Sequence, residues 1–600
     1  MTSTGSRSDS KQKNKAVDSN LIRRLYIYLH PYRWLLLLAL VLTLLSAFLG
    51  PLRPYLIQIA VDDYIAEDDY SGLFRITAIF ALVLVLETIL MIAVTFLTRW
   101  IGQSTLFKLR NAVFNKIQSL HVQFFDRNPI GRLITRTTND IEALSDLLSS
   151  GVVNMIGDLF RIIFIMGFMF YMSWELSLVA LSTLPVLFYA TFVFKSKVRV
   201  AFLNVRDQIS RLNSFVQEHI NGMSIVQLFN REEKELDRFK EINNDHTGAH
   251  IKTIFYFALF WPAVEVLSSL AMALVIWYGG ASALTGTVTF GILLAFIQYV
   301  RQFFLPIRDL SEKFNTLQSA LASSERLFSI MDTENQVQES ANPVTPRAVT
   351  GHIRFENVWF KYNSTEDYVL KDVSFEVKPG ENVAVVGATG AGKTTLINVV
   401  SRFYDVQKGS ITIDGIDIRE LSLKSLRSSF GVVLQDNALF SGTVLENITL
   451  GRDDISLETV QNAARMVQAD RFIKKLPGEY DFVLAERGAS LSMGQRQLLC
   501  FVRAMVYDPT IIILDEATSN VDSETESLVT GAMDKLMKGR SSIVIAHRLS
   551  TIQHADKILV MHKGRIRESG THQQLITVED GIYRRLYELQ YKDQAEVIPE

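Results

Sequence analysis

The sequence predicts an α-helical transmembrane domain joined to an α/β domain. The chain has 600 residues, of which 48% are hydrophobic, and its mean hydropathy is +0.17. Long apolar windows occur only before residue 310, which predicts a membrane portion in that half. Beyond a polar, proline-containing segment at 334–352, short apolar runs alternate with helical patterns. That alternation is typical of a largely parallel α/β sheet.

Six apolar windows are each long enough, at about 20 residues, to cross a bilayer as a helix. They are 34–59, 73–97, 152–172, 176–194, 255–278 and 290–305. The segments 99–127 and 197–221 contain no proline and keep apolar residues at helical spacing. We expect them to extend the second and fourth spans as helical arms, with breaks near 125–131 and 221–229. Such arms suit contact with a soluble domain, and a plain helical hairpin is the alternative.

Charge is distributed unevenly over the loops between these windows. The first loop has no Lys or Arg and carries Asp62, Asp63, Glu67, Asp68 and Asp69, whereas the second and fourth loops are rich in Lys and Arg. Since positive loops stay in the cytoplasm, the sequence predicts a multi-pass membrane protein with both termini cytoplasmic. The first twenty residues are polar and lack the apolar core of a signal peptide, so they are expected to form a disordered tail.

Composition sets further bounds on the organisation. The predicted parts are a tail (1–20), a transmembrane domain (21–333), a linker (334–352), an α/β domain (353–590) and a C-terminal tail (591–600). The net charge of −2 gives no reason to expect a nucleic-acid partner. The single cysteine, Cys500, excludes a disulfide framework within the chain and is expected to pack as a small apolar residue in a helix.

One loop of the second domain fits the pattern G-x-x-x-x-G-K-[ST] in full. It consists of Gly387, Ala388, Thr389, Gly390, Ala391, Gly392, Lys393 and Thr394, and a helical pattern begins at Thr395. The apolar run 383–386 precedes it, which completes the strand–loop–helix context that the pattern requires. Lys393 is expected to reach the β- and γ-phosphates, and the Thr394 hydroxyl to ligate Mg²⁺. This predicts an α/β P-loop NTPase domain that binds ATP.

Further polar residues follow predicted strands of this domain. The run 511–514 ends in Asp515 and Glu516, and His547 follows the run 542–546. Asp515 is expected beside the Mg²⁺, and Glu516 is placed to polarise an attacking water. His547 can reach the γ-phosphate from the carboxyl end of its strand. Acidic pairs at strand ends can instead cap helices, and a lone histidine is more often structural.

The pentapeptide Leu491 to Gln495 opens another helical pattern, with Ser492 as a good N-cap whose helix end could bind an anion. From about residue 20 to 590, the order and spacing of all these motifs resemble an ATP-binding cassette (ABC) exporter half-transporter. In that family one membrane domain with six spans, of the type I exporter fold, is fused to one nucleotide-binding domain. The resemblance implies an ATPase that drives transport.

The resemblance also implies roles for individual residues. Lys393, Glu516 and His547 would be catalytic, Tyr362 would stack on adenine, and Gln435 would touch Mg²⁺ together with Thr394 and Asp515. Ser492, Gly494 and Gln495 of the signature motif would complete the ATP site of a second subunit. Residues 519–522 would form the D-loop. The breaks near 125–131 and 221–229 would be coupling helices that transmit the state of the ATP site to the spans.

The chain departs from the family pattern at Met493, where the signature motif usually has glycine, and at Asn520, where the D-loop usually has a small residue. A side chain at Met493 would crowd a γ-phosphate that approaches the backbone closely. The chain thus combines an altered signature motif with intact Lys393, Glu516 and His547. This combination resembles one subunit of a heterodimeric exporter, in which one of the two ATP sites is impaired. A homodimer that tolerates methionine is the alternative.

The predicted spans contain few ionisable residues, namely Glu87, Asp158, Arg161 and Glu265. Asp158 and Arg161 are three residues apart, so they could pair on one helix face or be functional. Aromatic residues gather in the last two windows: Phe255, Tyr256, Phe257, Phe260, Trp261, Phe290, Phe296, Tyr299, Phe303 and Phe304. Such surfaces suit bulky apolar or cationic compounds, although many of these rings will face lipid or pack between helices.

A multidrug or lipid-like substrate is therefore predicted, moved across the plasma membrane of a bacterium. That location fits a chain without an organelle-targeting sequence. The alternative function is a membrane-anchored signalling or assembly ATPase that transports nothing.

Overall fold

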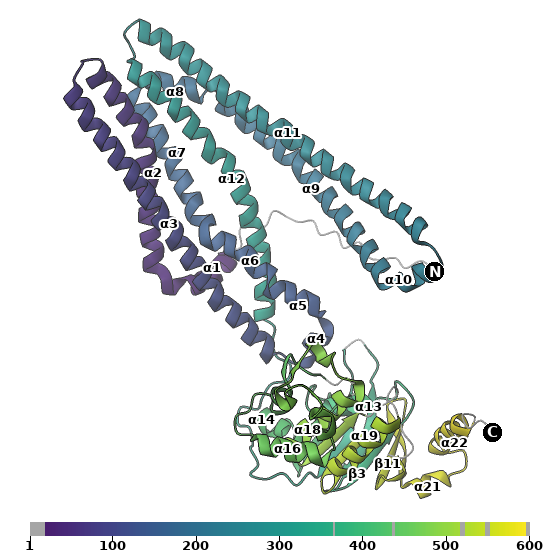
Figure 1. The fold of residues 1–600 in the computed structure, drawn as a ribbon. Coiled ribbons are helices and arrows are strands. Elements are labelled where there is room, and N and C mark those ends of the chain that lie inside the picture. Colours follow the sequence, from purple (N-terminus) through teal and green to yellow (C-terminus); the bar gives the residue numbers. More distant parts are fainter. Residues whose placement is uncertain (1–18, 364–365, 435–437, 516–522, 547–551, 596–600) are drawn as a thin grey trace. The chain divides into compact units, whose positions relative to one another are not determined.

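The computed structural model describes residues 19–363, 366–434, 438–515, 523–546 and 552–595. The chain divides into two compact units (Figure 1). The first unit contains Met1–Gln118 and Gly131–Asp332, and the second contains Ser119–Ile130 and Thr333–Glu600. A short piece of the first half thus belongs to the second unit, and each unit is described separately below.

The first unit is helical throughout its described residues. Its helices are α1 (Ser19–Leu29), α2 (Arg33–Ile59), α3 (Tyr70–Ser119), α5 (Ile130–Thr137), α6 (Asn139–Asp146), α7 (Val152–Met172), α8 (Trp174–Leu181), α9 (Leu184–Asn221), α10 (Met223–Leu228), α11 (Glu232–Leu284) and α12 (Phe290–Met331). Five segments of the described chain are long and apolar enough to cross a membrane, and the apolar part of α12, Phe290–Pro306, is shorter. The predicted helical membrane domain is confirmed.

Two boundaries differ from the sequence prediction. The fourth predicted span is divided into α8 and α9 at Ser182 and Thr183. Pro185 stands in the first turn of α9, where its missing N–H costs nothing, but its ring would clash with the backbone of a continuous helix. The first arm ends at Ser119 and is followed by a short helix, α4 (Val122–Arg127), which begins earlier than the predicted break at 125–131.

Aromatic residues of α12 form the centre of the bundle. Phe296, Tyr299 and Phe303 are buried together with residues of α7, α8 and α11. The Tyr299 hydroxyl donates a hydrogen bond of 2.7 Å to the carbonyl oxygen of Pro51 in α2. These rings therefore pack helices together, whereas Phe255 of α11 and Phe290 of α12 are exposed.

Asp62 fastens the end of the first span to the start of α12. Its carboxylate accepts hydrogen bonds from the backbone N–H of Gly291, at 2.8 Å, from Gln58 Nε2, at 3.0 Å, and from the hydroxyl of Thr289, the N-cap of α12. A Cβ at Gly291 would lie 2.6 Å from this carboxylate, so glycine leaves the room that the contact needs. A carboxylate at this position also complements the positive end of the helix.

Substituting Asp62 with alanine is expected to lower the free energy of unfolding of the first unit by about 1–2 kcal/mol, since it removes a helix cap and leaves donors unpaired. Thermal unfolding of the purified protein measures the change. Asp63→Ala is the matched control because its side chain is exposed next to Asp62. Equal unfolding temperatures for the two variants would contradict this role of Asp62.

A histidine joins α9 to α11 near α10, in the polar part of the arm beyond the apolar segment (Figure 1). His219 Nδ1 lies 2.8 Å from the carbonyl oxygen of Phe215, and Nε2 lies 2.9 Å from Glu235 Oε2. Both ring nitrogens thus face acceptors, and only the imidazolium can donate to both. The hydrogen bond to Glu235 raises the pKa of His219, and the same bond lowers the pKa of Glu235, which Arg231 also contacts.

The strength of the ion pair between His219 and Glu235 should depend on pH. Because the pKa of His219 is raised above its ordinary value of 6.5, its contribution is complete below about 6.5 and is lost as the pH rises through the folded-state pKa. The contribution of Glu235 is present above its ordinary pKa of 4.5. Amide hydrogen exchange near α10, corrected for intrinsic rates, is expected to be slower at about pH 6 than at about pH 8.5. His219→Gln should remove this difference in exchange rate. The control variant His250→Gln, at an exposed position of α11, should retain it. The same pH dependence of exchange in both variants would contradict the role of the His219–Glu235 ion pair.

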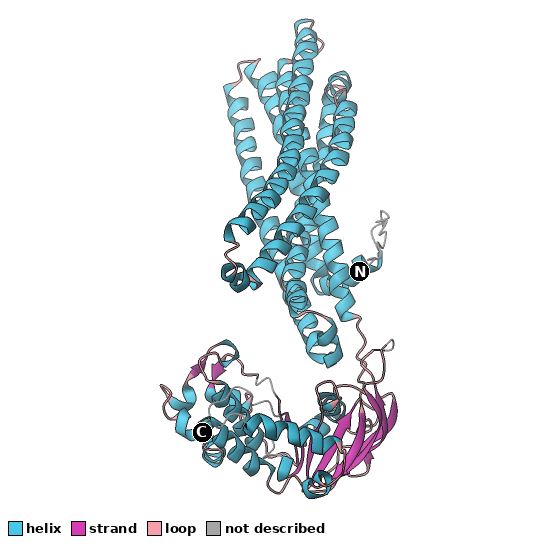
Figure 2. Ribbon diagram, turned by 90° about the vertical axis from the view of Figure 1, so that its right-hand side faces the viewer, coloured by secondary structure: helices cyan, strands magenta, loops and turns pink. Residues whose placement is uncertain are grey.

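The second unit contains all the described strands (Figure 2). They are β1 (Ile353–Phe360), β2 (Leu370–Val377), β3 (Asn382–Val386), β4 (Lys408–Ile413), β5 (Ile416–Asp417), β6 (Phe430–Val433), β7 (Gly442–Thr443), β8 (Val483–Leu484), β9 (Ile511–Asp515), β10 (Ser541–Ile545), β11 (Lys557–His562) and β12 (Arg565–Gly570). The helices are α4, α13 (Lys393–Val400), α14 (Leu423–Ser428), α15 (Val444–Thr449), α16 (Leu457–Met466), α17 (Asp470–Ile473), α18 (Met493–Val506), α19 (Ser523–Met537), α21 (His572–Ile576) and α22 (Ile582–Ala595).

The strands form two main sheets. The larger has the order β12-β11-β3-β10-β9-β6 and is parallel except for the β11–β12 pair, as predicted. Side chains of β3 alternate between two hydrophobic clusters, so both faces of this sheet are covered. One apolar run of this half, 411–413, belongs to β4, which lies in a separate antiparallel sheet of order β2-β1-β4-β5 and not in the parallel sheet. Asp414 and Gly415 form the tight turn of the β4–β5 hairpin. Cys500 is buried in α18, as expected.

Candidate nucleotide site

The strand order of the larger sheet brings the predicted site loops to one edge. Ile545 of β10 pairs in parallel with Val385 of β3 on one side and with Asp515 of β9 on the other. β6 continues the parallel pairing beyond β9. The carboxyl ends of these four strands therefore lie in a row, at the edge where ligands of open parallel sheets bind.

The loop after β3 has the backbone of a phosphate cradle. Gly387, Gly390 and Gly392 have φ angles of +154°, +79° and +105°, a region that residues with a Cβ rarely adopt. A Cβ at Gly387 would lie 2.3 Å from the carbonyl oxygen of Met561, so the close passage of this loop against β11 requires glycine. Gly392 directly precedes α13, whose N–H groups face the loop. The loop and the helix end together can bind an anion.

Lys393 is the cation of this loop. Its side chain is buried, and Nζ donates to the carbonyl oxygens of Gly387, at 2.6 Å, and Ala388, at 3.3 Å. Burial lowers the pKa of Lys393, and the carboxylate of Asp515 partly offsets this effect. The described partners of this ammonium group are neutral carbonyl oxygens, so its positive charge is free to attract an anion. The terminal phosphates of a nucleotide would supply that anion and form charge-assisted hydrogen bonds with Nζ.

Two described residues have the oxygen donors that Mg²⁺ prefers. Thr394 is exposed in the first turn of α13. Asp515 is the last residue of β9, and its negative charge raises the pKa of Lys393. A hydroxyl and a carboxylate next to a phosphate cradle fit Mg²⁺, which usually binds through few protein ligands and the substrate's phosphates. The ion would neutralise charge on those phosphates, and Thr394 and Asp515 would hold it.

Tyr362 lies beside the helix that follows the loop. Its hydroxyl is 3.0 Å from Thr395 Oγ1 and accepts a hydrogen bond of 3.3 Å from Asn398 Nδ2. Its ring packs edge-on against Phe360, at 5.0 Å, and Tyr404, at 5.1 Å. The structure thus places an aromatic residue next to the predicted nucleotide site, and Thr395 of the predicted phosphate set is buried against it.

The short helix α4 contacts this aromatic group, which the sequence did not reveal. Gln123 Nε2 donates a hydrogen bond of 2.6 Å to the carbonyl oxygen of Tyr362, and Arg127 donates to the same atom at 3.2 Å. Tyr404 donates to the carboxylate of Asp126, and burial together with that contact raises the pKa of Tyr404. The sequence around Gln123, which directly precedes Phe124 and Phe125, does not indicate this contact, because the acceptor lies 239 positions away.

The predicted signature segment forms the start of α18. Ser492 is the N-cap and accepts from Gln495 N at 3.3 Å, while Gln495 Oε1 accepts from Ser492 N at 3.0 Å. This reciprocal capping box confirms Ser492 as an N-cap. Ser492 is exposed, Met493 is half-buried and Gly494 is buried.

Several predicted site residues lie outside the described residues. They are Gln435, which follows β6, Glu516, which follows β9, His547, which follows β10, and the D-loop residues 519–522. Their predicted roles remain predictions.

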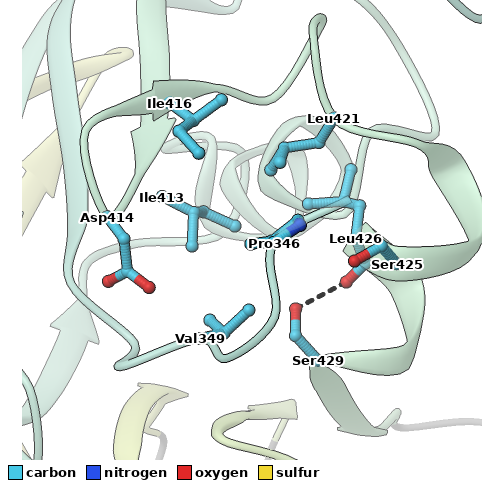
Figure 3. A pocket seen from close by; sticks show the side chains of 9 residues that line it. All are labelled: Pro346, Val349, Ile413, Asp414, Ile416, Leu421, Ser425, Leu426 and Ser429. Atoms are coloured by element: carbon cyan, nitrogen blue, oxygen red, sulfur yellow. Dashed lines mark hydrogen bonds between the residues drawn. The ribbon is translucent and has the colours of Figure 1, made fainter. Parts of the chain in front are cut away.

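A small cavity elsewhere in the second unit is no candidate for the nucleotide. It measures about 10 Å³ and is lined mainly by apolar residues such as Pro346, Ile413 and Leu421 (Figure 3). The Asp414 carboxylate at its rim already accepts from the backbone N–H groups of Thr350 and His352. The space would hold about one water molecule.

Comparison with known proteins agrees with this arrangement. Residues 36–307 match the family model of the ABC transporter transmembrane region, and residues 370–519 match that of the ABC transporter. The chain is 38% identical to the uncharacterized ABC transporter ATP-binding protein YknV of Bacillus subtilis, over 96% of this chain and 95% of the relative. It is 34% identical to the ATP-dependent lipid A-core flippase of Desulfotalea psychrophila, over 96% and 100% of the two chains.

A third relative is the putative multidrug export ATP-binding/permease protein YgaD of Bacillus subtilis, at 34% identity over 95% of this chain and 99% of the relative. The matches extend over both the helical unit and the nucleotide unit. The chain therefore belongs to the ABC transporter family and carries the transmembrane region and the ATP-binding domain of an ATPase-coupled transporter on one polypeptide.

Proposed function

We propose that the protein exports hydrophobic compounds, multidrug-like or lipid-like, across the plasma membrane by alternating access. One observation carries the proposal: a phosphate cradle at the carboxyl edge of a parallel sheet is encoded in the same chain as a bundle of apolar helices. The names of two relatives, a lipid flippase and a putative multidrug exporter, support the direction and the class of substrate. The acidic first loop and the basic arms support cytoplasmic termini.

In the proposed mechanism, the loop N–H groups and Lys393 bind the phosphates, and Thr394, Gln435 and Asp515 hold Mg²⁺. Glu516 polarises the attacking water, and His547 contacts the γ-phosphate. Ser492, Gly494 and Gln495 would act on the ATP of a second subunit. The exposed N-cap of α18 is suitable for that role, since its helix end is open to an incoming phosphate.

The second subunit is proposed to be another half-transporter, with a heterodimer preferred because of Met493. The helix α10 supports the need for a partner: Leu228 at its end and Phe229 next to it are 75% and 66% exposed. Apolar residues so exposed at a polar helical arm suit docking on another protein. Purifying the chain by itself in detergent and measuring mass and ATP hydrolysis tests this choice. A stable, fully active dimer of this chain alone would contradict the heterodimer.

Reconstitution tests the export function. The transporter, with its co-purifying partner, is placed in liposomes, and the movement of a hydrophobic dye or a fluorescent lipid is followed with ATP and with ADP. Movement that requires ATP is expected. ATP hydrolysis without movement of any compound would favour a signalling or assembly ATPase.

A further inference from the structure

One arginine fastens the segment that follows β6 to the helix that carries the signature motif. Residues 438–440 lie between β6 and β7, and Arg503 is in the last turn of α18. Arg503 Nη1 donates a hydrogen bond of 3.2 Å to the carbonyl oxygen of Ala438, and Nε donates one of 2.9 Å to the carbonyl oxygen of Asn447 in α15. A single planar guanidinium therefore holds two stretches of backbone at a fixed spacing.

The side chain of Asn447 binds the same segment. Its Oδ1 accepts a hydrogen bond of 2.8 Å from the backbone N–H of Phe440, and its Nδ2 donates to the carbonyl oxygens of Phe440, at 2.9 Å, and Thr443, at 3.1 Å. Asn447 is only 3% exposed. The amide thus uses its acceptor and both of its donors on one turn of backbone, so this turn, α15 and Arg503 form one connected polar network.

The beginning of α18 is also tied to this segment. Leu439 is buried, and a Cβ on Gly488, whose φ is +64°, would lie 2.7 Å from Leu439 Cδ1. Arg496 of α18 donates to the carbonyl oxygens of Gly488, at 3.4 Å, and Leu491, at 3.2 Å. Leu439 and Leu491 belong to the same hydrophobic cluster as the buried residues of α18. The segment 438–440 is therefore connected to structure at both ends of α18.

These contacts join parts of the chain that have two different tasks in the proposed function. Gln435, three positions before Ala438, is proposed to touch Mg²⁺ at this chain's own ATP site. Ser492, the N-cap of α18, is proposed to act on the ATP of the second subunit. Because Arg503 and Leu439 hold the segment 438–440 against α18, a movement of this segment on nucleotide binding would move α18 with it. Two sites are coupled when both bias one such element.

We propose that Arg503 is a positioning residue that couples the two ATP sites of the assembled transporter. It transmits the occupancy of this chain's own site to the signature motif, so that ATP at one site raises the affinity for ATP at the other. The inference rests on the proposed function, because it requires the second subunit and the role of the signature motif. Arg503 itself lies outside every motif of the nucleotide site.

The dependence of hydrolysis on ATP concentration tests the proposal, measured on the purified transporter with its partner in nanodiscs. The wild-type transporter is expected to give a sigmoidal curve, with a Hill coefficient above about 1 and at most about 2, since two sites take part. Arg503→Met should lower the coefficient to about 1. Coupling factors between sites are typically about 5 to 150, so the half-saturating ATP concentration should rise at least about twofold. The maximal rate should change less, because the catalytic residues are intact.

Two further variants separate coupling from folding. Arg540→Met is the matched control, since Arg540 also binds a main-chain carbonyl, that of Leu536, at 2.7 Å, and pairs with Asp508, at 2.7 Å. This control should unfold at a lower temperature than wild type but keep the wild-type Hill coefficient. Arg503→Lys keeps the charge but has one donor group, which cannot bind both carbonyl oxygens as the guanidinium does. Its Hill coefficient should lie between those of wild type and Arg503→Met.

The Lys variant decides the matter if Arg503→Met does not fold, and a wild-type Hill coefficient in Arg503→Lys would then overturn the proposal. A folded Arg503→Met variant with the wild-type coefficient, or an equal loss in Arg540→Met, would also overturn it. A wild-type coefficient of about 1 in a transporter that moves dye would overturn the coupling and leave export intact. Cooperative hydrolysis that depends on Arg503, without movement of any compound, would support the coupling and contradict export.

Discussion

Replacing Lys393 with alanine is expected to reduce ATP hydrolysis by at least about 100-fold, because the variant loses the one cation that the loop aims at the terminal phosphates. In the structure, Nζ lies 2.6 Å from the carbonyl oxygen of Gly387, which places the ammonium group within the phosphate-binding loop. Phosphate release by the purified transporter in nanodiscs measures the effect. ATP affinity, measured by titration with a fluorescent analogue, is expected to weaken as well.

Lys475→Ala is the matched control, because Lys475 is exposed on the same unit. It should hydrolyse ATP at the wild-type rate. A Lys393→Ala variant that retains more than about a tenth of that rate would contradict the role of this lysine as a stabiliser of the transferred phosphate.

Substituting Arg402 with methionine is expected to lower the free energy of unfolding of the second unit by about 3 kcal/mol, and its unfolding temperature by roughly 5–10 °C. The side chain is only 2% exposed. It donates to the carbonyl oxygens of Gln338, at 2.7 Å, and Ile418, at 3.1 Å, and to Asp405, at 3.0 Å. Methionine would fill the volume but leave these buried acceptors without a donor. The residue thereby holds the segment before β1 against the ATP-binding domain.

Thermal unfolding of the purified protein, followed by intrinsic fluorescence, measures this loss. Arg419→Met is the control because its pair with Asp417 is 44% exposed on the arginine side, and such pairs contribute about 0–1 kcal/mol. An Arg402 variant that unfolds at the same temperature as the Arg419 variant would contradict the account.

The parts that could be predicted from sequence are those encoded in local pattern. Apolar windows placed the membrane helices, and the strand–loop–helix pattern around residues 387–394 placed β3 and α13 to within two residues. The N-cap role of Ser492 also follows from the local pattern, whereas the reciprocal hydrogen bond from Gln495 was found only in the structure. Each of these features depends on neighbours within a few residues.

Other features depend on partners far along the chain and could not be predicted. Asp158 pairs with Lys313, 155 positions away and beyond the end of the sixth predicted window, so local spacing pointed to Arg161 instead. The cap that Asp62 provides to α12 spans 229 positions. Likewise, only tertiary contact brings α4 to Tyr362, because nothing in the sequence near Gln123 specifies that carbonyl as its acceptor.

The most direct test of the account is ATP-dependent dye uptake into inside-out vesicles that contain either the wild-type chain or Glu516→Gln, each with its partner. The account predicts that wild-type vesicles accumulate the dye with ATP, and that the Glu516→Gln vesicles bind ATP but neither hydrolyse it nor accumulate dye. Wild-type vesicles that hydrolyse ATP without accumulating any compound, or a Glu516→Gln variant that transports as fast as wild type, would contradict it.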